Sequence, residues 1–192
     1  LLAARNLPIV FEDDVSGLVA RALHDGKIVA WFEGRMESGP RALGARSILM
    51  SPLRAENKDV INQRVKFREG FRPFCPSMLA EKSDDYLVNP RSERFMITSF
   101  SVTPAKREAI PAVVHVDDTV RPQTVERAAN ERYHEVIKRF GELSGESVVL
   151  NTSLNVKGEP IICHPREAIR AFFDTGLDCM VLGNYVLSKD PT

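Results

Sequence analysis

Basic side chains gather in one stretch of a chain whose formal net charge is zero, with 26 basic and 26 acidic residues in total. The window from Arg35 to Arg72 holds nine basic and four acidic residues, so it carries +5 and the remainder −5. Arg54, Lys58 and Arg64 are interpreted as solvated positions on helices and loops. The other six lie among glycine, proline and aromatic residues, a context that favours a site for anions.

The first motif in this window is Gly-Pro-Arg-Ala-Leu-Gly-Ala-Arg-Ser, from Gly39 to Ser47. Its two glycines are spaced as in a nucleotide-binding P-loop, but Ala-Arg-Ser follows where that loop has Lys and Ser or Thr. The P-loop is therefore excluded. Glycines still allow the backbone to approach a phosphate closely, and Arg41 and Arg46 supply charge. We predict a phosphate-binding loop of another kind, with both arginines as anion ligands.

The second motif, Val-Lys-Phe-Arg-Glu-Gly-Phe-Arg-Pro-Phe, runs from Val65 to Phe74. In an extended segment, Lys66 and Arg68 would project to the same face. An ammonium group beside a guanidinium suits a small dianion such as phosphate or carboxyphosphate, and Arg72 follows in the same motif. The alternative is an exposed strand edge that its charges protect from pairing.

The third motif follows a hydrophobic run and reads Leu-Asn-Thr-Ser-Leu-Asn-Val-Lys-Gly-Glu-Pro, from Leu150 to Pro160. Ligands of α/β sheets bind where strands end. The amides and hydroxyls that begin at Asn151 are therefore candidates for a binding site. The alternative is a polar turn without a ligand.

Several other chemistries are excluded or disfavoured. No pair of histidines has zinc-ligand spacing, and no Gly-x-Ser-x-Gly motif is present; only His164, at the start of a predicted helix, is kept as a histidine for the site. Cys75, Cys163 and Cys179 are an odd set, interpreted as buried reduced thiols of a cytoplasmic protein. Neither an apolar run of membrane-spanning length nor a signal peptide is found in the sequence.

The elements that must position these motifs follow from periodicity. The chain has 192 residues, 43% of them hydrophobic and 27% charged, which excludes disordered, collagen-like and coiled-coil chains. Helices are predicted over residues 13–25, 56–65, 130–143 and 165–175, and Pro40 is placed to open a short helical turn. Strands are predicted over residues 27–32, 47–50, 74–79, 95–102, 110–116, 147–150 and 179–187. This alternation indicates one α/β domain around a mixed sheet, with strand 147–150 central.

Four long motifs of the sequence, in the order in which that family has them, resemble the C-terminal domain of the NodU/CmcH-type O-carbamoyltransferases. The resemblance spans about residues 13–188 and rests on these segments: Gly34–Leu49, Val65–Phe74, Arg121–Val125 and Leu150–Ile161. That domain is similar in fold to YrdC, whose signature pairs Lys-x-Arg with Ser-x-Asn. Lys66-Phe-Arg68 and Ser153-Leu-Asn155 match the pair. The resemblance implies a YrdC-like α/β domain with a twisted mixed sheet flanked by helices.

The resemblance also implies an activity. In this family the C-terminal domain converts carbamoyl phosphate and ATP to a carbamoyl-adenylate and releases pyrophosphate. A metal-bearing N-terminal domain then transfers the carbamoyl group to a hydroxyl of a sugar or antibiotic. Mg²⁺ is expected to accompany ATP, because this chain shows no acidic cluster to hold it alone, and no metal ligand is assigned within the chain.

Roles for individual residues follow from the resemblance. The residues expected to act on carbamoyl phosphate and the activated carbamate are Lys66, Arg68 and Arg121. Those expected to bind substrate as further ligands are Arg41, Arg46, Arg72 and Asn151. Those expected to hold the nucleotide phosphates are Thr152, Ser153 and Asn155.

Residues 1–192 are expected to form a single carbamoyltransferase C-terminal domain. The chain begins without Met, so we expect an N-terminal domain of the same polypeptide as its partner. A homodimer is left open, and no membrane or nucleic acid is expected as a partner. One alternative is a domain that makes threonylcarbamoyl-adenylate from threonine, bicarbonate and ATP for tRNA modification. Another is a non-catalytic RNA-binding module whose basic window is interleaved with Phe67, Phe71 and Phe74.

Overall fold

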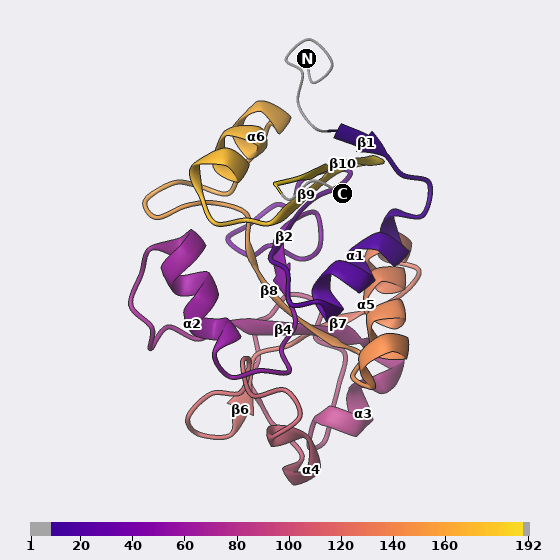
Figure 1. Cartoon of the computed structure of the whole chain (residues 1–192). Helices are drawn as coiled ribbons and strands as arrows, with labels where there is room; N and C mark the ends of the chain where they lie inside the picture. The colour runs from indigo at the N-terminus through magenta and orange to yellow at the C-terminus, as the bar shows by residue number, and fades with distance from the viewer. Residues whose placement is uncertain (1–8, 190–192) are drawn as a thin grey trace.

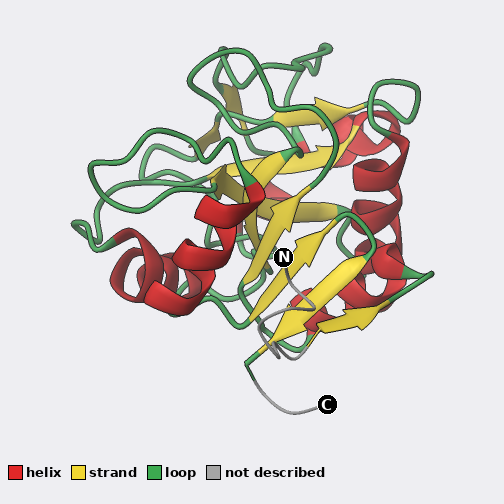
Figure 2. Ribbon diagram, turned by 90° about the horizontal axis from the view of Figure 1, so that it is seen from above, coloured by secondary structure: helices red, strands yellow, loops and turns green. Residues whose placement is uncertain are grey.

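The computed structural model describes residues 9–189, and its centre is a mixed sheet of eight strands in the order β1-β10-β9-β2-β3-β8-β4-β7. These strands are β1 (Ile9–Phe11), β2 (Val29–Phe32), β3 (Arg46–Met50), β4 (Cys75–Leu79), β7 (Gln123–Val125), β8 (Val148–Ser153), β9 (Cys179–Leu182) and β10 (Tyr185–Ser188). The pairs β2–β9 and β4–β7 are parallel and the others antiparallel. Strand β8 lies inside the sheet, between β3 and β4, and the sheet is twisted (Figure 2).

Two helices cover one face of this sheet: α1 (Val15–His24) and α5 (Glu131–Ser144) lie side by side there (Figure 1). Helix α1 begins after Asp14, whose carboxylate accepts a hydrogen bond from the Gly17 N–H at 3.2 Å. Apolar side chains at helical spacing on α5, from Tyr133 to Phe140, are fully buried against α1 and the sheet. The helices predicted over 13–25 and 130–143 are confirmed.

The opposite face is covered by α2 (Asn57–Ile61), a π-helical turn that continues it (Asn62–Lys66), and α6 (Pro165–Asp174) (Figure 1). Ile61 and Phe172 reach the core from these helices and are fully buried. Helix α6 begins at His164, where Glu167 accepts the His164 backbone N–H at 3.0 Å and completes a capping box. The helices predicted over 56–65 and 165–175 are confirmed, the first with a π-helical end.

Residues 80–120 form a smaller lobe of short elements. It contains a 3₁₀ turn (Ala80–Lys82), α3 (Ser83–Tyr86), α4 (Pro104–Arg107), and a two-stranded sheet of β5 (Phe100–Ser101) and β6 (Thr119–Val120). The strand predicted over 95–102 is wrong for residues 95–99, where Met96 has a left-handed φ of 55° and the Glu93 carboxylate binds the backbone N–H groups of Phe95 and Thr98. The strand predicted over 110–116 is also wrong, because most of those residues lie in turns.

Three smaller predictions need correction. The strand predicted over 179–187 is a hairpin that turns at Gly183, which has a φ of 61°. Pro40 opens no helical turn and lies in a series of bends. Cys75 and Cys179 are buried as expected, but Cys163 is exposed.

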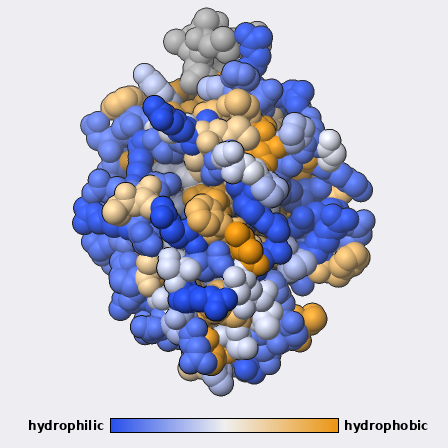
Figure 3. Space-filling model, turned by 180° about the vertical axis from the view of Figure 1, so that it is seen from behind, coloured by the Kyte–Doolittle hydropathy of each residue, from blue (hydrophilic) through white to orange (hydrophobic). Residues whose placement is uncertain are grey.

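The surface is mostly polar on the face that Figure 3 shows, where apolar residues occur in small groups between hydrophilic ones. Within residues 9–189, no helix combines the length and the apolar character needed to cross a bilayer.

Candidate functional site

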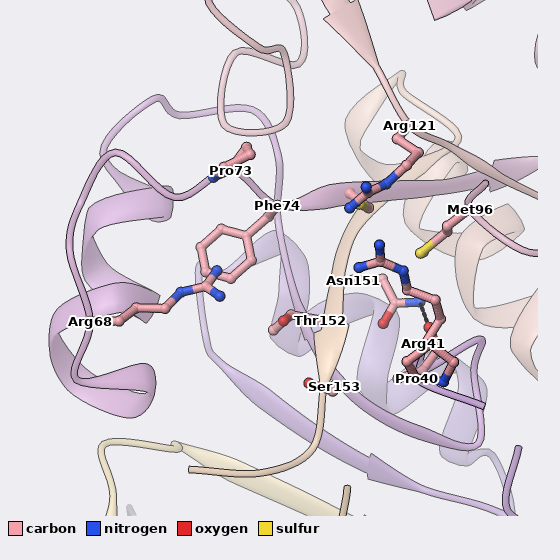
Figure 4. A pocket seen from close by; sticks show the side chains of 12 residues that line it. Pro40, Arg41, Arg68, Pro73, Phe74, Met96, Arg121, Asn151, Thr152 and Ser153 are labelled. Carbon is pink, nitrogen blue, oxygen red and sulfur yellow. Dashed lines mark hydrogen bonds between the residues drawn. The ribbon is translucent and has the colours of Figure 1, made fainter. Parts of the chain in front are cut away.

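A pocket of about 130 Å³ opens where β8 ends, and it collects residues from all three motifs (Figure 4). Asn151, Thr152 and Ser153 come from β8, and the chain entering β4 adds Arg68, Phe74 and Cys75. The predicted site residues that line it are Arg41, Arg68, Arg121, Asn151, Thr152 and Ser153. These residues are far apart in the sequence, and the pairing of β8 with its neighbours β3 and β4 in the sheet brings them together.

Three arginines face this pocket from different sides. Figure 4 shows Arg41 and Arg121 on one side and Arg68, beside the Phe74 ring, on the other. The Arg68 guanidinium lies 4.6 Å from the centre of that ring, and a nitrogen of Arg121 lies 3.5 Å from the Cys75 Sγ. Within residues 9–189, none of the three arginines has a carboxylate at ion-pair distance. The pocket therefore holds uncompensated positive charge, which suits a phosphate or carboxylate ligand.

Arg68 is held in place by the π-helical turn before it. Its Nε donates to the Oδ1 of Asn62 at 2.7 Å, and Asn62 is fully buried. Burial and the neighbouring Arg72 lower the pKa of Arg68. The terminal nitrogens of the guanidinium remain on the side of the pocket, in the fork geometry that recognises oxyanions.

Lys66 binds the turn that follows β8. Its Nζ lies 2.5 Å from the Ser153 carbonyl oxygen, 3.0 Å from the Asn155 carbonyl oxygen and 2.8 Å from the Asn155 Oδ1. Only 5% of Lys66 is exposed, and burial together with Arg68 lowers its pKa to about 7. Lys66 thus fixes the position of the polar turn and adds titratable charge beside the pocket.

The backbone around Lys66 differs from the prediction. The segment from Lys66 to Arg68 is not extended: Lys66 ends the π-helical turn, and Phe67 has a left-handed φ of 47°. Because of this kink, Lys66 binds the turn at Asn155 and Arg68 lines the pocket, so the two side chains point in different directions.

A second hollow, of about 180 Å³, continues from the first along the polar turn. Arg68 and Ser153 line both, and Lys66, Arg72 and Asn155 line the second. The exposed Arg72 forms an ion pair with Glu69 at 3.0 Å. The two hollows together give room for a ligand with more than one anionic group.

The glycine loop, residues 34–44, is folded around the Glu37 carboxylate. Its Oε1 accepts hydrogen bonds from the backbone N–H groups of Leu43 and Ala45, both at 2.7 Å, and of Arg46 at 3.3 Å. Gly44 has a φ of 99° and packs against the Tyr133 ring. The carboxylate thus ties the loop to the start of β3, and Pro40 lies in a bend of this loop.

Arg46 does not reach the pocket. Its guanidinium lies 3.5 Å from the centre of the Phe32 ring and donates to the backbone carbonyls of Glu33, Gly34 and Ala45. Arg46 is 5% exposed, and burial lowers its pKa. In this structure it stabilises the loop instead of serving as an anion ligand.

Sequence reasoning missed the residues that support Asn151. Ser77 on β4 and Gln123 on β7 hold its amide from behind. Gln123 lies in the Arg121–Val125 segment of the resemblance but received no role there, and Ser77 lies in none of the four segments. Cys75 was noted only as a thiol, although it directly follows the Arg-Pro-Phe end of the second motif and lines the pocket. Within the described residues, no group of three or more His, Cys, Asp or Glu side chains is arranged to hold a metal ion.

Comparison with known proteins places this chain in a family. The family model described as "Carbamoyltransferase C-terminus" matches residues 20–189. The chain belongs to this family.

Named relatives agree with this membership. The nodulation protein NolNO of Sinorhizobium fredii is 45% identical over 180 residues, which are 92% of this chain and 26% of that protein. The 3'-hydroxymethylcephem-O-carbamoyltransferase of Amycolatopsis lactamdurans is 34% identical over 172 residues, covering 90% of this chain and 32% of the relative. The chain thus spans about a quarter to a third of the length of these relatives.

Solved structures show the fold. Full-length HypF in the phosphate- and nucleotide-bound form matches with a TM-score of 0.61 at 23% identity, over 90% of this chain and 25% of that one. Sua5 of P. abyssi complexed with L-threonine matches with a TM-score of 0.60 at 16% identity, over 88% and 46%. The predicted YrdC-like fold, a mixed sheet flanked by helices, is confirmed.

Proposed function

We propose that this chain activates carbamoyl phosphate: it binds carbamoyl phosphate and ATP, forms a carbamoyl-adenylate and serves an O-carbamoyltransferase. The observation that carries the proposal is the pocket where Arg41, Arg68 and Arg121 face the polar end of β8 without a carboxylate partner among the described residues. Membership of the carbamoyltransferase family supports the choice of carbamoyl phosphate over other dianions.

The proposed reaction balances as two steps. Water cleaves carbamoyl phosphate to carbamate and phosphate. A carbamate oxygen then attacks the α-phosphorus of ATP, and pyrophosphate leaves. The first step separates two anions and the second brings carbamate and ATP, both anions, together, so the acceleration rests on positioning and on concentrated positive charge.

Residues receive roles from their place in the two hollows. Arg68 and Arg121 bind the phosphate of carbamoyl phosphate and then the carbamate, and Arg41 closes the same pocket from the glycine loop. Lys66 positions the polar turn and adds charge. Residues of the second hollow and the end of β8 bind the nucleotide phosphates: Arg72, Thr152, Ser153 and Asn155. Mg²⁺ is carried by ATP, and the acceptor site together with its metal belongs to an N-terminal domain of the same polypeptide.

The test is exchange of labelled pyrophosphate into ATP, which reports adenylate formation without any acceptor hydroxyl. We expect exchange that depends on carbamoyl phosphate and falls at least tenfold when Arg68 or Arg121 is replaced by Ala. The matched control is Arg54→Ala, because Arg54 is exposed and pairs only with Glu56. Since the chain spans about a third of its relatives' length, the assay is run on both this chain and the longer polypeptide of a relative.

Two results would overturn the proposal. Exchange stimulated by threonine plus bicarbonate, and not by carbamoyl phosphate, would assign the site to threonylcarbamoyl-adenylate formation. Exchange that does not change in either arginine variant would show that the pocket is not the site of adenylation.

A further inference from the structure

Asn151 lines the pocket and carries a side-chain oxygen without a hydrogen-bond partner among the described residues. Asn151 is 2% exposed, and this oxygen, Oδ1, is buried. A buried amide oxygen without a donor is costly and therefore rare. An atom of this kind on a residue that lines a binding pocket is a candidate contact for a ligand donor.

Neighbouring groups fix which end of the amide faces the pocket. The Asn151 Nδ2 donates to the Ala42 carbonyl at 3.0 Å and to the Ser77 Oγ at 2.9 Å, with a longer contact of 3.4 Å to the Gln123 Oε1. A carbonyl oxygen can only accept, so the atom that meets Ala42 must be the nitrogen. Figure 4 shows a dashed line from the Asn151 amide nitrogen, with the amide oxygen turned to the other side.

The network behind Asn151 holds this orientation. Gln123 donates through Nε2 to the Leu43 carbonyl at 2.8 Å, which fixes its Oε1 as the acceptor for the Ser77 hydroxyl at 2.8 Å. With its proton given to Gln123, the Ser77 oxygen accepts from Asn151. The chain of donors therefore runs in one direction and leaves the Asn151 Oδ1 as an acceptor without a donor among the described residues.

The geometry points to Asn151 as the residue that recognises the NH₂ group of the carbamoyl moiety, so that the pocket distinguishes a carbamoyl phosphate from an acyl phosphate. This inference rests on the proposed function. The NH₂ group is the one feature that separates carbamoyl phosphate from acetyl phosphate, in which a methyl group takes its place. With acetyl phosphate bound, the Oδ1 would stay unpaired against a methyl group, and arginine contacts to the phosphate would be unchanged.

The test compares binding of carbamoyl phosphate, acetyl phosphate and inorganic phosphate by calorimetry. In the wild-type chain we expect carbamoyl phosphate to bind between about fivefold and a hundredfold more tightly than acetyl phosphate. Asn151→Leu, similar in shape but without the oxygen, should bring this ratio to about one while inorganic phosphate still binds. Ser77→Ala is the matched control: it removes one buried partner of the same amide, while the Ala42 carbonyl still fixes the amide orientation and the Oδ1 remains, so the ratio should stay high.

Each outcome decides between the claims. Equal affinity of the wild-type chain for the two acyl phosphates would overturn the role of Asn151, and it needs no variant that must fold. A ratio that stays high in Asn151→Leu would overturn it as well. Binding of all three anions that weakens in Arg68→Ala would then leave the proposed function standing. If none of the anions binds the wild-type chain, the proposed function fails and the inference fails with it.

Discussion

Replacing Arg68 with Lys keeps the charge at the site and removes the geometry that the structure assigns to it. The Arg68 Nε bond to Asn62, at 2.7 Å, and the stacking over Phe74, at 4.6 Å, both need a planar guanidinium. A lysine ammonium cannot make both contacts and also present a fork to an oxyanion. Arg68→Lys should therefore fail to restore the function that Arg68→Ala removes.

The expected magnitude follows from the hydrogen bonds that a lysine at position 68 cannot form. One charge-assisted hydrogen bond to a bound phosphate contributes about 1.5–3 kcal/mol, which corresponds to roughly tenfold to hundredfold weaker binding. Asn62 is fully buried, and its Oδ1 has no donor in the variant. An unsatisfied buried acceptor should lower the free energy of unfolding by about 1–3 kcal/mol.

Calorimetry with carbamoyl phosphate and with pyrophosphate measures the first effect, and urea unfolding measures the second. Arg54→Lys is the control, since its surface ion pair with Glu56 should change neither quantity by more than about 0.5 kcal/mol. Wild-type affinity in Arg68→Lys would show that only charge matters there, and it would refute the assignment of a guanidinium fork to the pocket.

Four further predictions concern Lys66, Gly44 and Glu37, which lie around the pocket. Burial lowers the pKa of Lys66 to about 7, so at pH 8 this amine is mostly neutral. A bound anion favours the charged amine, and anion binding at pH 8 should therefore be accompanied by uptake of a fraction of a proton by Lys66. Calorimetry in buffers of different ionisation enthalpy should detect this uptake in the wild-type chain and not in Lys66→Met. Unfolding restores the usual pKa of about 10.5, so the contribution of Lys66 to the free energy of unfolding should rise between pH 7 and 10.5, and the variant should lack this slope. Gly44→Ala should lower the free energy of unfolding by about 1–3 kcal/mol, because φ is 99° there and a Cβ would lie 2.2 Å from the Tyr133 ring. Gly34→Ala is the control, since there is open space around Gly34, and it should lower the free energy of unfolding less. Equal losses in the two variants, measured by urea unfolding, would contradict the role of packing at Gly44. Glu37→Ala should leave three backbone N–H groups of the glycine loop without their acceptor, lowering the free energy of unfolding by about 1.5–3 kcal/mol and weakening phosphate binding; unchanged binding would mean that the loop does not need the carboxylate.

Periodic burial explains which elements the sequence could predict. On α1 and α5 each apolar stripe packs against the sheet, so local pattern and tertiary structure agree. Between Phe95 and Val102 the apolar and polar residues alternate as in a strand, yet Phe95 is 55% exposed and Ile97 is 75% exposed. Phe100 and Ser101 pair with β6 and Val102 forms a single bridge with Leu87, while the Glu93 carboxylate holds residues 95–98 in a loop. Alternation alone does not reveal whether a partner strand exists.

The site shows a similar limit. The residue types of the three motifs predicted an anion pocket, and the structure brings Arg41, Arg68 and Ser153 from these motifs to one pocket. Arg121, which also lines it, was a candidate only through the family resemblance. The sequence could not predict the conformation of the segment at Lys66, because the bonds that hold it come from Asn155, 89 positions away. The sequence also could not predict that Arg46 donates to backbone carbonyls. An arginine in a glycine-rich motif can bind a ligand or stabilise the loop, and the local sequence does not distinguish the two roles.

A crystal structure with phosphonoacetamide tests most directly whether the arginine pocket binds carbamoyl phosphate. This stable analogue of carbamoyl phosphate has a CH₂ group in place of the bridging oxygen. We expect its phosphonate oxygens within about 3.2 Å of guanidinium nitrogens of Arg68 and Arg121, at the end of β8. Binding instead in the separate hollow beside Arg35 and Arg94, with the pocket of Arg68 empty, would contradict the proposed site.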